Sequence, residues 1–526
     1  MDWIKSLYIQ GFKKFKHLEV LFNQHTNILV GENEAGKSTV LDAIKTVLNQ
    51  QYRNADKSIL GELFNQQLKD EFRANPVIET LPSICIEVFF ELEPDHKDAE
   101  YFYGQNNHTG KAEYGICFSC EFDQELGQGL EDQIAQGHIP YEYYALKWTT
   151  FAGRPYQMIK RPLGFVAIDT ANTNTSQSFN YYNKALFNSS YSDNDRMSAK
   201  NQFREKLGVT FNDLNLPVLD SRQKFGIDFK KIILENIISI FQDDIALENK
   251  GSGMESLIKT KIALNRRQTH LDVVLLEEPE NHLSFSNLRK MIAIIEDQKN
   301  ESQIIIATHS SMIASHLNLN NVIWIANNEA KSLRSVNPKV ASFFEKADDN
   351  SFLQLLLSKK AILVEGATEY LLVPYFYKQI VGRTLEQDNI TIIACNGVSY
   401  KNYLAIVSAT DKKIAVITDN DEIQSKIDDA KEWNEKNKLT RIFMDSNLEG
   451  WTWEACMYRQ NEEALNDLVD VQKGAKYPFH GKSYEDEPVL GKMLNNKVET
   501  AYKMLLSRKK FTAPDYVEDA IKWISE

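Results

Sequence analysis

The stretch AILVEGATEYLLVPYF, Ala361 to Phe376, begins as an apolar run of the kind that forms a buried strand and stops at Glu365. The following residues have the composition of a helix, and Glu369 falls in its first turn, four residues beyond Glu365, so both can face one point. A strand that leads into a helix is typical of an α/β domain, where ligands gather at the carboxyl ends of the strands. The stretch therefore predicts a fold class and a place for chemistry.

The same alternation continues along the chain. Further apolar strands are predicted at 389–395, 413–418 and 440–444, with helices at 400–409 and 423–436 between them. Strands that alternate with helices form a parallel sheet. Polar residues follow each of the first strands, namely Glu365, then Asn396 and Gly397, then Asp419 and Asp421.

Four of these carboxylates form a candidate metal site. Glu365, Glu369, Asp419 and Asp421 would repel one another at one sheet edge unless cations lay among them, and Asp419 and Asp421 share a side if the chain there is extended. Ligands that are all oxygen select Mg²⁺ or Mn²⁺, and two such ions about 4 Å apart support phosphodiester hydrolysis. For Glu369 a helix cap is the competing interpretation.

A nucleotide site is predicted in the first half of the chain. The segment GENEAGKST, Gly31 to Thr39, joins an apolar strand to a helix with apolar spacing, and its GxxxxGKS pattern is that of a phosphate-binding loop. Backbone N–H groups surround the phosphates, the lysine reaches the terminal phosphates and the serine hydroxyl binds Mg²⁺. The expected ATP contacts are Gly31, Asn33, Gly36, Lys37, Ser38 and Thr39, with Ser38 also a Mg²⁺ ligand.

Two later strands supply the acids and the histidine that such a site needs. LDVVLLEEPENHL, Leu271 to Leu283, ends its apolar run in Glu277, an expected Mg²⁺ ligand, and Glu278, expected to polarise the attacking water. QIIIATHSS is another buried strand, and His309 at its end is a candidate sensor of the γ-phosphate. A purely structural histidine is the alternative.

Taken together, these motifs resemble the RecF/SMC-like branch of ABC-type ATPases. ENKGSGMES, Glu248 to Ser256, is similar to the signature loop of that branch, with Ser252 and Gly253 on the γ-phosphate of a nucleotide held by the partner head. In that branch two heads enclose ATP between them. The resemblance therefore implies a homodimer or a larger homo-oligomer.

The second half resembles the Toprim domain as it occurs in OLD (overcoming lysogenization defect) nucleases, through LVEGATEYLLVP and VITDND, and the order of the two domains is that of the family. The resemblance implies that Glu454 in TWEACM is a further metal ligand, with Cys456 where the family has an aspartate. It also makes Lys497 a catalytic candidate that would neutralise charge on the scissile phosphate. A lysine on an exposed helix face is the alternative for Lys497.

The predicted fold class is α/β in two parts. An ABC-type (RecF/SMC-like) ATPase domain is expected at 1–350, with a mainly helical insert at about 164–244 that serves either as a dimerisation element or as a lid. A Toprim domain with a Rossmann-like parallel sheet is expected at 351–480, completed by a C-terminal helical segment at 481–526.

Length, composition and net charge restrict the class of protein that the chain can form. The chain has 526 residues, of which 43% are hydrophobic and 25% charged, as in globular proteins of two or three domains. It shows no membrane-spanning run or signal peptide, and with five scattered cysteines it is predicted to be cytoplasmic. Cys117 and Cys120 form a CxxC, but on a strand they would point to opposite faces, which argues against a metal site there. The net charge of −13 repels nucleic acid on average and leaves room for local basic patches.

We therefore expect an ATP-binding, metal-dependent DNA endonuclease or nickase whose ATPase head controls assembly or access. The resemblance extends this role to antiviral defence, with a co-encoded helicase or reverse transcriptase (retron) as a candidate partner that the sequence leaves open. The alternative is a non-catalytic, ATP-driven DNA clamp or sensor with a degenerate Toprim domain. A topoisomerase or a primase would need a tyrosine-bearing cleavage domain or a template-binding module, and the sequence shows neither.

Overall fold

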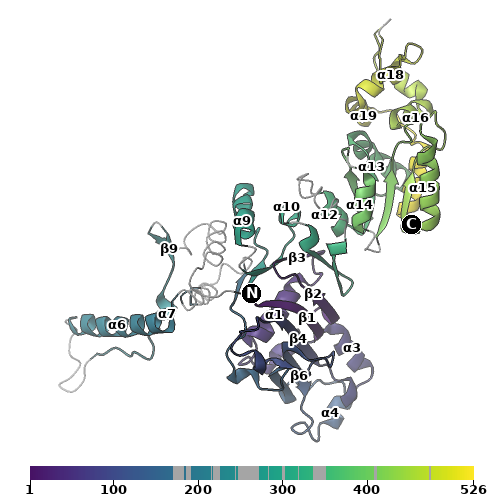
Figure 1. The fold of residues 1–526 in the computed structure, drawn as a ribbon. Coiled ribbons are helices and arrows are strands. Elements are labelled where there is room, and N and C mark those ends of the chain that lie inside the picture. The colour runs from purple at the N-terminus through teal and green to yellow at the C-terminus, as the bar shows by residue number, and fades with distance from the viewer. Residues whose placement is uncertain are drawn as a thin grey trace. The chain divides into compact units, whose positions relative to one another are not determined.

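The computed structural model describes the chain in two compact units, Met1–Ser335 and Val336–Glu526, each with its own sheets (Figure 1). The described residues are 1–169, 183–184, 187, 191–214, 216, 225–242, 244–246, 272–281, 283–298, 302–317, 319–335, 351–397, 399–407, 412–472 and 476–526.

The N-terminal unit contains a mainly antiparallel sheet of order β2-β1-β4-β6-β5, with β7 also paired to β6. Its strands are β1 (Trp3–Phe12), β2 (Phe15–Leu21), β4 (Ile84–Glu91), β5 (Tyr103–Gly104), β6 (Glu113–Phe122) and β7 (Tyr144–Thr150). Side chains alternate across each strand. On β4, Ile86 and Val88 therefore enter the core, whereas Cys85 and Glu87 lie on the other face.

A second sheet of the same unit has the order β14-β13-β3-β12-β11-β8, parallel except for β14. Its strands are β3 (Thr26–Val30), β8 (Phe165–Asp169), β11 (Val273–Glu277), β12 (Gln303–Ala307), β13 (Val322–Ala326) and β14 (Glu329–Ser332). The central strands are buried on both faces, which explains their unbroken apolar runs. Because β3, β12 and β11 are adjacent parallel strands, the three predicted nucleotide motifs lie together at the carboxyl ends of these strands.

Helix α1 (Lys37–Asn49) contacts strands of both sheets. The indole of Trp148 on β7 donates to the carbonyl of Thr46 on this helix (2.9 Å). Other α-helices and short strands that the structure describes in this unit are α2 (Leu60–Leu63), α3 (Gln66–Ala74), α4 (Glu131–Ala135), α6 (Asp193–Asn212), α7 (Leu234–Ile237), α9 (Phe285–Gln298), α10 (Ser311–His316), β9 (Phe241–Gln242) and β10 (Ile245–Ala246).

Gln303 links the two sheets by hydrogen bonds. Its side-chain oxygen accepts from the backbone N–H of Ile4 (2.9 Å), and its amide nitrogen donates to the carbonyls of Ile4 and Asn23 (both 2.8 Å). The side chain is fully buried. A buried amide with all of these bonds made fixes β1 against the start of β12.

The C-terminal unit is built on a wholly parallel sheet of order β16-β15-β17-β18. Its strands are β15 (Lys360–Val364), β16 (Ile390–Ala394), β17 (Lys413–Ile417) and β18 (Thr440–Phe443). The helices are α12 (Ser351–Leu357), α13 (Ala367–Val381), α14 (Tyr400–Val407), α15 (Gln424–Lys436), α16 (Trp453–Gln460), α17 (Glu462–Asn466), α18 (Pro488–Asn495), α19 (Lys497–Leu506) and α20 (Asp515–Ser525). The predicted α/β fold class, with its Rossmann-like parallel sheet, is confirmed.

Helices from the end of the chain complete the core of this unit. Helix α13 packs against α19 and α20, and α20 also lies on β17. Val517, Ile521 and Ile524 of α20 are fully buried in the same cluster as the strand residues Ile362 and Val364. Strand β15 of the sheet therefore depends on helices that lie more than a hundred residues further along the chain.

Among the described residues, none of the helices combines the length and the apolar character that crossing a bilayer requires.

Gln303→Ala is expected to destabilise the N-terminal unit by about 2–4 kcal/mol, because it removes two buried hydrogen bonds to the backbone of Ile4 and a third to the carbonyl of Asn23. The measurement is the urea midpoint of the full chain, followed by circular dichroism. Gln66→Ala, at an exposed position of α3, is the control and should leave the midpoint unchanged. Equal midpoints for both variants would contradict the role given to Gln303.

Candidate nucleotide and metal sites

The phosphate-binding loop joins β3 to α1 and depends on its glycines. Gly36 has a φ of 102°, in the left-handed region that favours glycine, and a Cβ there would lie 2.3 Å from the ring of Phe15. A Cβ at Gly31 would lie 2.5 Å from the carbonyl oxygen of Ile325. The first turn of α1 leaves backbone N–H groups available, as an anion site requires.

Lys37 is held inside this loop. Its ammonium group donates to the carbonyls of Gly31 (2.9 Å) and Glu32 (3.0 Å). Burial lowers the pKa of Lys37, and the nearby carboxylates of Glu278 and Glu280 partly oppose that shift. A cavity of about 570 Å³ opens beside it, lined by Lys14, Asn33, Glu34, Gly36, Lys37, Ser38, Thr39, Glu278 and His309. The structure thus brings most of the predicted nucleotide contacts to one cavity.

The paired acids lie at the end of β11 and face different partners. Glu277 lies 3.7 Å from the ammonium of Lys45, which also pairs with Asp42 (2.6 Å). Glu278 has a φ of 44°, and its carboxylate lies 3.0 Å from the ring nitrogen Nε2 of His309. The predicted water-polarising acid and the predicted sensor are therefore in direct contact.

Glu280 is a site residue that the sequence reasoning missed. Its Oε1 accepts three hydrogen bonds, from the hydroxyl of Thr308 (2.6 Å) and the backbone N–H groups of His309 (2.8 Å) and Ser310 (3.1 Å). These contacts order the loop that carries His309. The sequence shows Glu280 as the third acid of EEPE. Its hydrogen-bond partners could not be read from that motif, because they lie some thirty residues further along the chain. The predicted signature residues Ser252 and Gly253 lie outside the described residues.

In the C-terminal unit, Glu365 and Asp419 meet because β15 and β17 are neighbours. The Oε1 atom of Glu365 accepts from the hydroxyl of Thr418 and from the backbone N–H of Asp419 (3.0 Å). The carboxylate of Asp419 accepts in turn from the hydroxyl of Thr452 and the backbone N–H of Trp453 (both 2.9 Å). Both carboxylates are thereby fixed in orientation.

Glu454 and Lys497 join the same cluster from two helices. The Oε2 atom of Glu454, on α16, accepts from Thr452 (2.9 Å) and lies 2.8 Å from the ammonium of Lys497 at the start of α19. Glu454 is only 3% exposed. Burial alone would lower the pKa of Lys497, but Glu454, with Asp419 and Glu369, raises it above its usual value. Lys497 is thus ion-paired with a buried acid while its side chain is 40% exposed.

Glu369 makes the capping contact that the sequence offered as the competing interpretation, and its role as a metal ligand stays a prediction. Its Oε2 accepts from the backbone N–H of Gly366 (3.1 Å), which is a capping contact at the start of α13. It is also buried, and burial, followed by the charges of Glu454 and Glu365, raises its pKa to about 7. Burial and the charges of Glu365, Glu369 and Glu454 likewise hold the pKa of Asp419 well above its usual range. Carboxylates that disfavour one another's charge to this degree fit a bound cation.

Asp421 is placed differently from the expected geometry. Strand β17 ends at Ile417, and Asp421 has a φ of 51°, so the alternation of an extended chain does not reach it. Its half-exposed carboxylate pairs with Lys426. The buried amide of Asn420 donates to the carbonyls of Asp445, Asn447 and Gly450 (3.0, 3.0 and 3.2 Å), which fixes this turn.

Cys456, at the position of the family's second acid, contacts the same turn. Its thiol donates to the carboxylate of Asp445 (3.3 Å) and to the carbonyl of Gly450 (3.4 Å).

Comparison with known proteins finds similarity in both units of the chain. The family described as "Overcoming lysogenization defect protein-like, TOPRIM domain" matches residues 356–421, and the family described as "AAA ATPase domain" matches 3–206. The chain is similar to the Old nuclease of Escherichia phage P2, with 22% identity over 470 residues, which cover 80% of this chain and 77% of that one. It is also similar to the DNA replication and repair protein RecF of Clostridium acetobutylicum, with 37% identity over 60 residues, or 11% of this chain and 16% of RecF.

Two solved structures show weaker likeness. The C-terminal region of the Burkholderia pseudomallei OLD protein has 18% identity and a TM-score of 0.24, covering 32% of this chain and 97% of that one. An SMC head bound to the C-winged helix domain of ScpA has 15% identity and a TM-score of 0.34, covering 63% of this chain and 97% of that one.

The fold and the sequence matches define an ATPase domain followed by a Toprim domain. The resemblance drawn from the motifs is confirmed, because the chain is similar to OLD ATPase–Toprim nucleases in both domains.

Glu369→Gln is expected to stabilise the metal-free protein at alkaline pH. The raised pKa of Glu369 means that the folded state disfavours its charge, so stability is lost as pH rises from about 4.5 to about 7. The amide still accepts the capping bond, and removing the charge should recover up to roughly 3 kcal/mol at pH 8 and less than about 1 kcal/mol at pH 5. The measurement is the thermal unfolding of the C-terminal unit in chelator at both pH values. A gain in stability that is the same at both pH values would contradict the raised pKa of Glu369.

Glu280→Ala is expected to lower kcat for ATP hydrolysis by about 10- to 100-fold with little change in KM, because His309 and its loop lose three hydrogen bonds. Glu280→Gln, whose amide oxygen can still accept these bonds, should retain most of the activity. Glu296→Ala, at an exposed position of α9, is the control. An unchanged kcat in Glu280→Ala would show that the loop is ordered without Glu280.

Proposed function

We propose that this protein is an ATP-regulated, metal-dependent DNA endonuclease or nickase that acts in antiviral defence. The observation that carries the proposal is the convergence of Glu365, Glu369, Asp419 and Glu454 with Lys497 at the carboxyl edge of one parallel sheet. All of the acidic ligands are oxygen donors, which suits Mg²⁺ or Mn²⁺.

The residues of the cluster divide the work of cutting a phosphodiester. Bound divalent ions would supply an activated water and stabilise the leaving oxygen. The Thr452 hydroxyl lies 2.9 Å from oxygens of both Asp419 and Glu454 and can donate its one proton to either, while the backbone N–H of Trp453 holds Asp419, so the acids are oriented before a ligand arrives. Lys497, already at the cluster, would neutralise charge that develops on the scissile phosphate. Asp421 is proposed as a further ligand that must first release Lys426.

The ATPase domain is proposed to control this activity. Asn33, Gly31, Gly36, Lys37, Ser38 and Thr39 would hold ATP, and Ser38 and Glu277 its Mg²⁺. The contact between Glu278 and His309 would orient the attacking water and report the γ-phosphate. Ser252 and Gly253 would act on the nucleotide of a second subunit, which makes the protein at least a homodimer. Exposed apolar side chains at Met197, Val209 and Phe241, between 191 and 246, support a dimerisation role for the predicted insert.

A non-catalytic, ATP-driven DNA clamp is the second candidate. The specific observation in its favour is that Asp421, a predicted ligand, pairs with Lys426 and lies half exposed.

The test is cleavage of supercoiled plasmid by the full chain with Mg²⁺ or Mn²⁺, with and without ATP. Glu365→Ala and Asp419→Ala should each reduce cleavage by about 100-fold or more, because each removes a ligand from the cluster. Glu463→Ala, an exposed acid on α17, is the matched control and should cut normally.

The variant Lys37→Ala distinguishes regulation by ATP from DNA cleavage itself. We expect it to abolish the response to ATP while plasmid cleavage by the metal site persists. Cleavage that survives in the Glu365→Ala, Asp419→Ala double variant would overturn the assigned site, and no cleavage with either metal would favour the clamp.

A further inference from the structure

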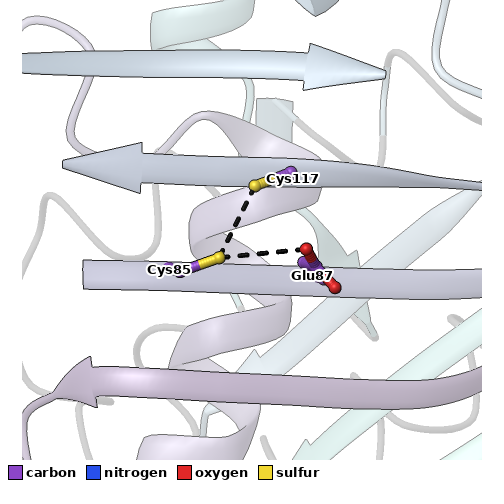
Figure 2. Close-up of side chains that lie close together, drawn as sticks. All are labelled: Cys85, Glu87 and Cys117. Atoms are coloured by element: carbon purple, nitrogen blue, oxygen red, sulfur yellow. Dashed lines mark hydrogen bonds between the residues drawn. The ribbon is translucent and has the colours of Figure 1, made fainter. Parts of the chain in front are cut away.

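Two thiols and a carboxylate converge on the antiparallel sheet of the N-terminal unit, and none of the three belongs to the predicted nucleotide or nuclease site. Cys85 and Glu87 belong to β4 and Cys117 belongs to β6 (Figure 2). In the register of these strands Glu87 is directly opposite Cys117, and Cys85 is opposite Ser119. Because side chains alternate along a strand, all three project from the same face.

The spacing of the ligand atoms is that of a tetrahedral metal site. The two sulfur atoms are 3.8 Å apart, and the Cys85 sulfur is 3.9 Å from Oε1 of Glu87. All three ligand atoms lie within 4.8 Å of one another. Two thiolates bound to zinc at about 2.3 Å with a tetrahedral angle have their sulfurs about 3.8 Å apart. The observed sulfur separation therefore accommodates one zinc ion.

A disulfide does not explain the same pair. Cys85 and Cys117 occupy diagonal positions of neighbouring strands, because their direct partners are Ser119 and Glu87. Diagonal Cα atoms in an antiparallel pair are about 7–8 Å apart, whereas disulfides rarely span more than about 6.8 Å. Forming the S–S bond would require movement of strands that are held by continuous pairing on both sides.

His108 fixes the carboxylate. Its backbone N–H donates to both oxygens of Glu87 (2.9 and 3.1 Å), and its ring nitrogen Nδ1 lies 2.6 Å from Oε2. The imidazole stacks on Tyr8 with ring centres 3.9 Å apart and meets Phe89 edge-on at 5.6 Å. The imidazole therefore engages Oε2, and Oε1, which accepts from the backbone N–H of His108 and keeps a second lone pair, faces the Cys85 sulfur. Partners that orient a metal ligand in this way raise affinity for the ion.

We propose that Cys85, Cys117 and Oε1 of Glu87 bind a Zn²⁺ ion, with water in the fourth position and His108 as a positioning residue. Two sulfur ligands and one carboxylate match the borderline-soft character of zinc, and on binding the two thiols release their protons to solvent. The ion would tie β4 to β6. This site is separate from the proposed nuclease centre, whose donors are all oxygen.

The test is cobalt and zinc binding by the purified full chain. Zinc is measured by elemental analysis after dialysis against limiting zinc, and we expect about one ion per chain in excess of the Cys85→Ser, Cys117→Ser double variant. Cobalt should give a thiolate-to-metal charge-transfer absorption in the wild-type chain, which a site of oxygen ligands cannot produce. Cys120→Ala is the matched control, because Cys120 lies three residues from Cys117 but points into the core.

Two further variants keep the test decisive if the double variant folds poorly. Glu87→Gln, of equal size, and His108→Ala should each weaken zinc affinity by about 10- to 100-fold in competition with a chelator. The absence of the cobalt band in the folded wild-type chain would overturn the proposal, and so would equal zinc content in the wild-type chain and the double variant. Because neither readout is cleavage, failure here is distinguishable from failure of the nuclease assignment.

Discussion

Repulsion among buried carboxylates is the constraint around which the C-terminal unit is built. Asp419 and Glu454 lie within hydrogen-bond distance of one threonine, Thr452, and Glu369 lies close enough to both for their charges to act on one another. Such a group of acids is costly to bury unless a cation compensates it. Lys497 supplies one positive charge through its pair with Glu454. The C-terminal helices therefore have two roles. Helix α20 covers the sheet, and α19 supplies the lysine whose positive charge partly compensates the buried acids.

The parts of this cluster that the sequence could predict are those that follow from strand order. Glu365 and Asp419 follow strands that a parallel α/β pattern predicts to share one sheet, and β15 and β17 are paired. Asp421 departs from the expected geometry because the argument assumed an extended chain, whereas the backbone turns after Ile417 and Asn420 anchors that turn. Glu454 and Lys497 come from helices whose packing no local pattern encodes. Only the family resemblance pointed to them.

In the N-terminal unit, too, residues at strand ends could be predicted from the sequence, whereas contacts that depend on how strands pair could not. Lys37, Glu278 and His309 could be predicted because each follows a strong apolar strand, and β3, β11 and β12 lie in one sheet. Glu280 could not be predicted, because its role depends on hydrogen bonds to a loop that lies beside it only when the parallel strands pair. The CxxC shows this most clearly: the expected opposite orientation of Cys117 and Cys120 holds, and Cys120 enters the core. The partner of Cys117 is Cys85, which only the pairing of β4 with β6 could reveal.

The two proposed metal centres differ in the chemistry that would fill them, and that difference follows from their ligands. The Toprim cluster offers carboxylate oxygens and a neutralising lysine, a set that suits hard ions which exchange with substrate oxygens. The sheet cluster offers two sulfurs on adjacent strands with an oriented carboxylate, a set that suits zinc with one open coordination position. Since thiolates hold zinc far more strongly than they hold magnesium, the sheet site can stay filled while the ions at the Toprim cluster exchange. Each centre would therefore be loaded by a different ion from the same solution.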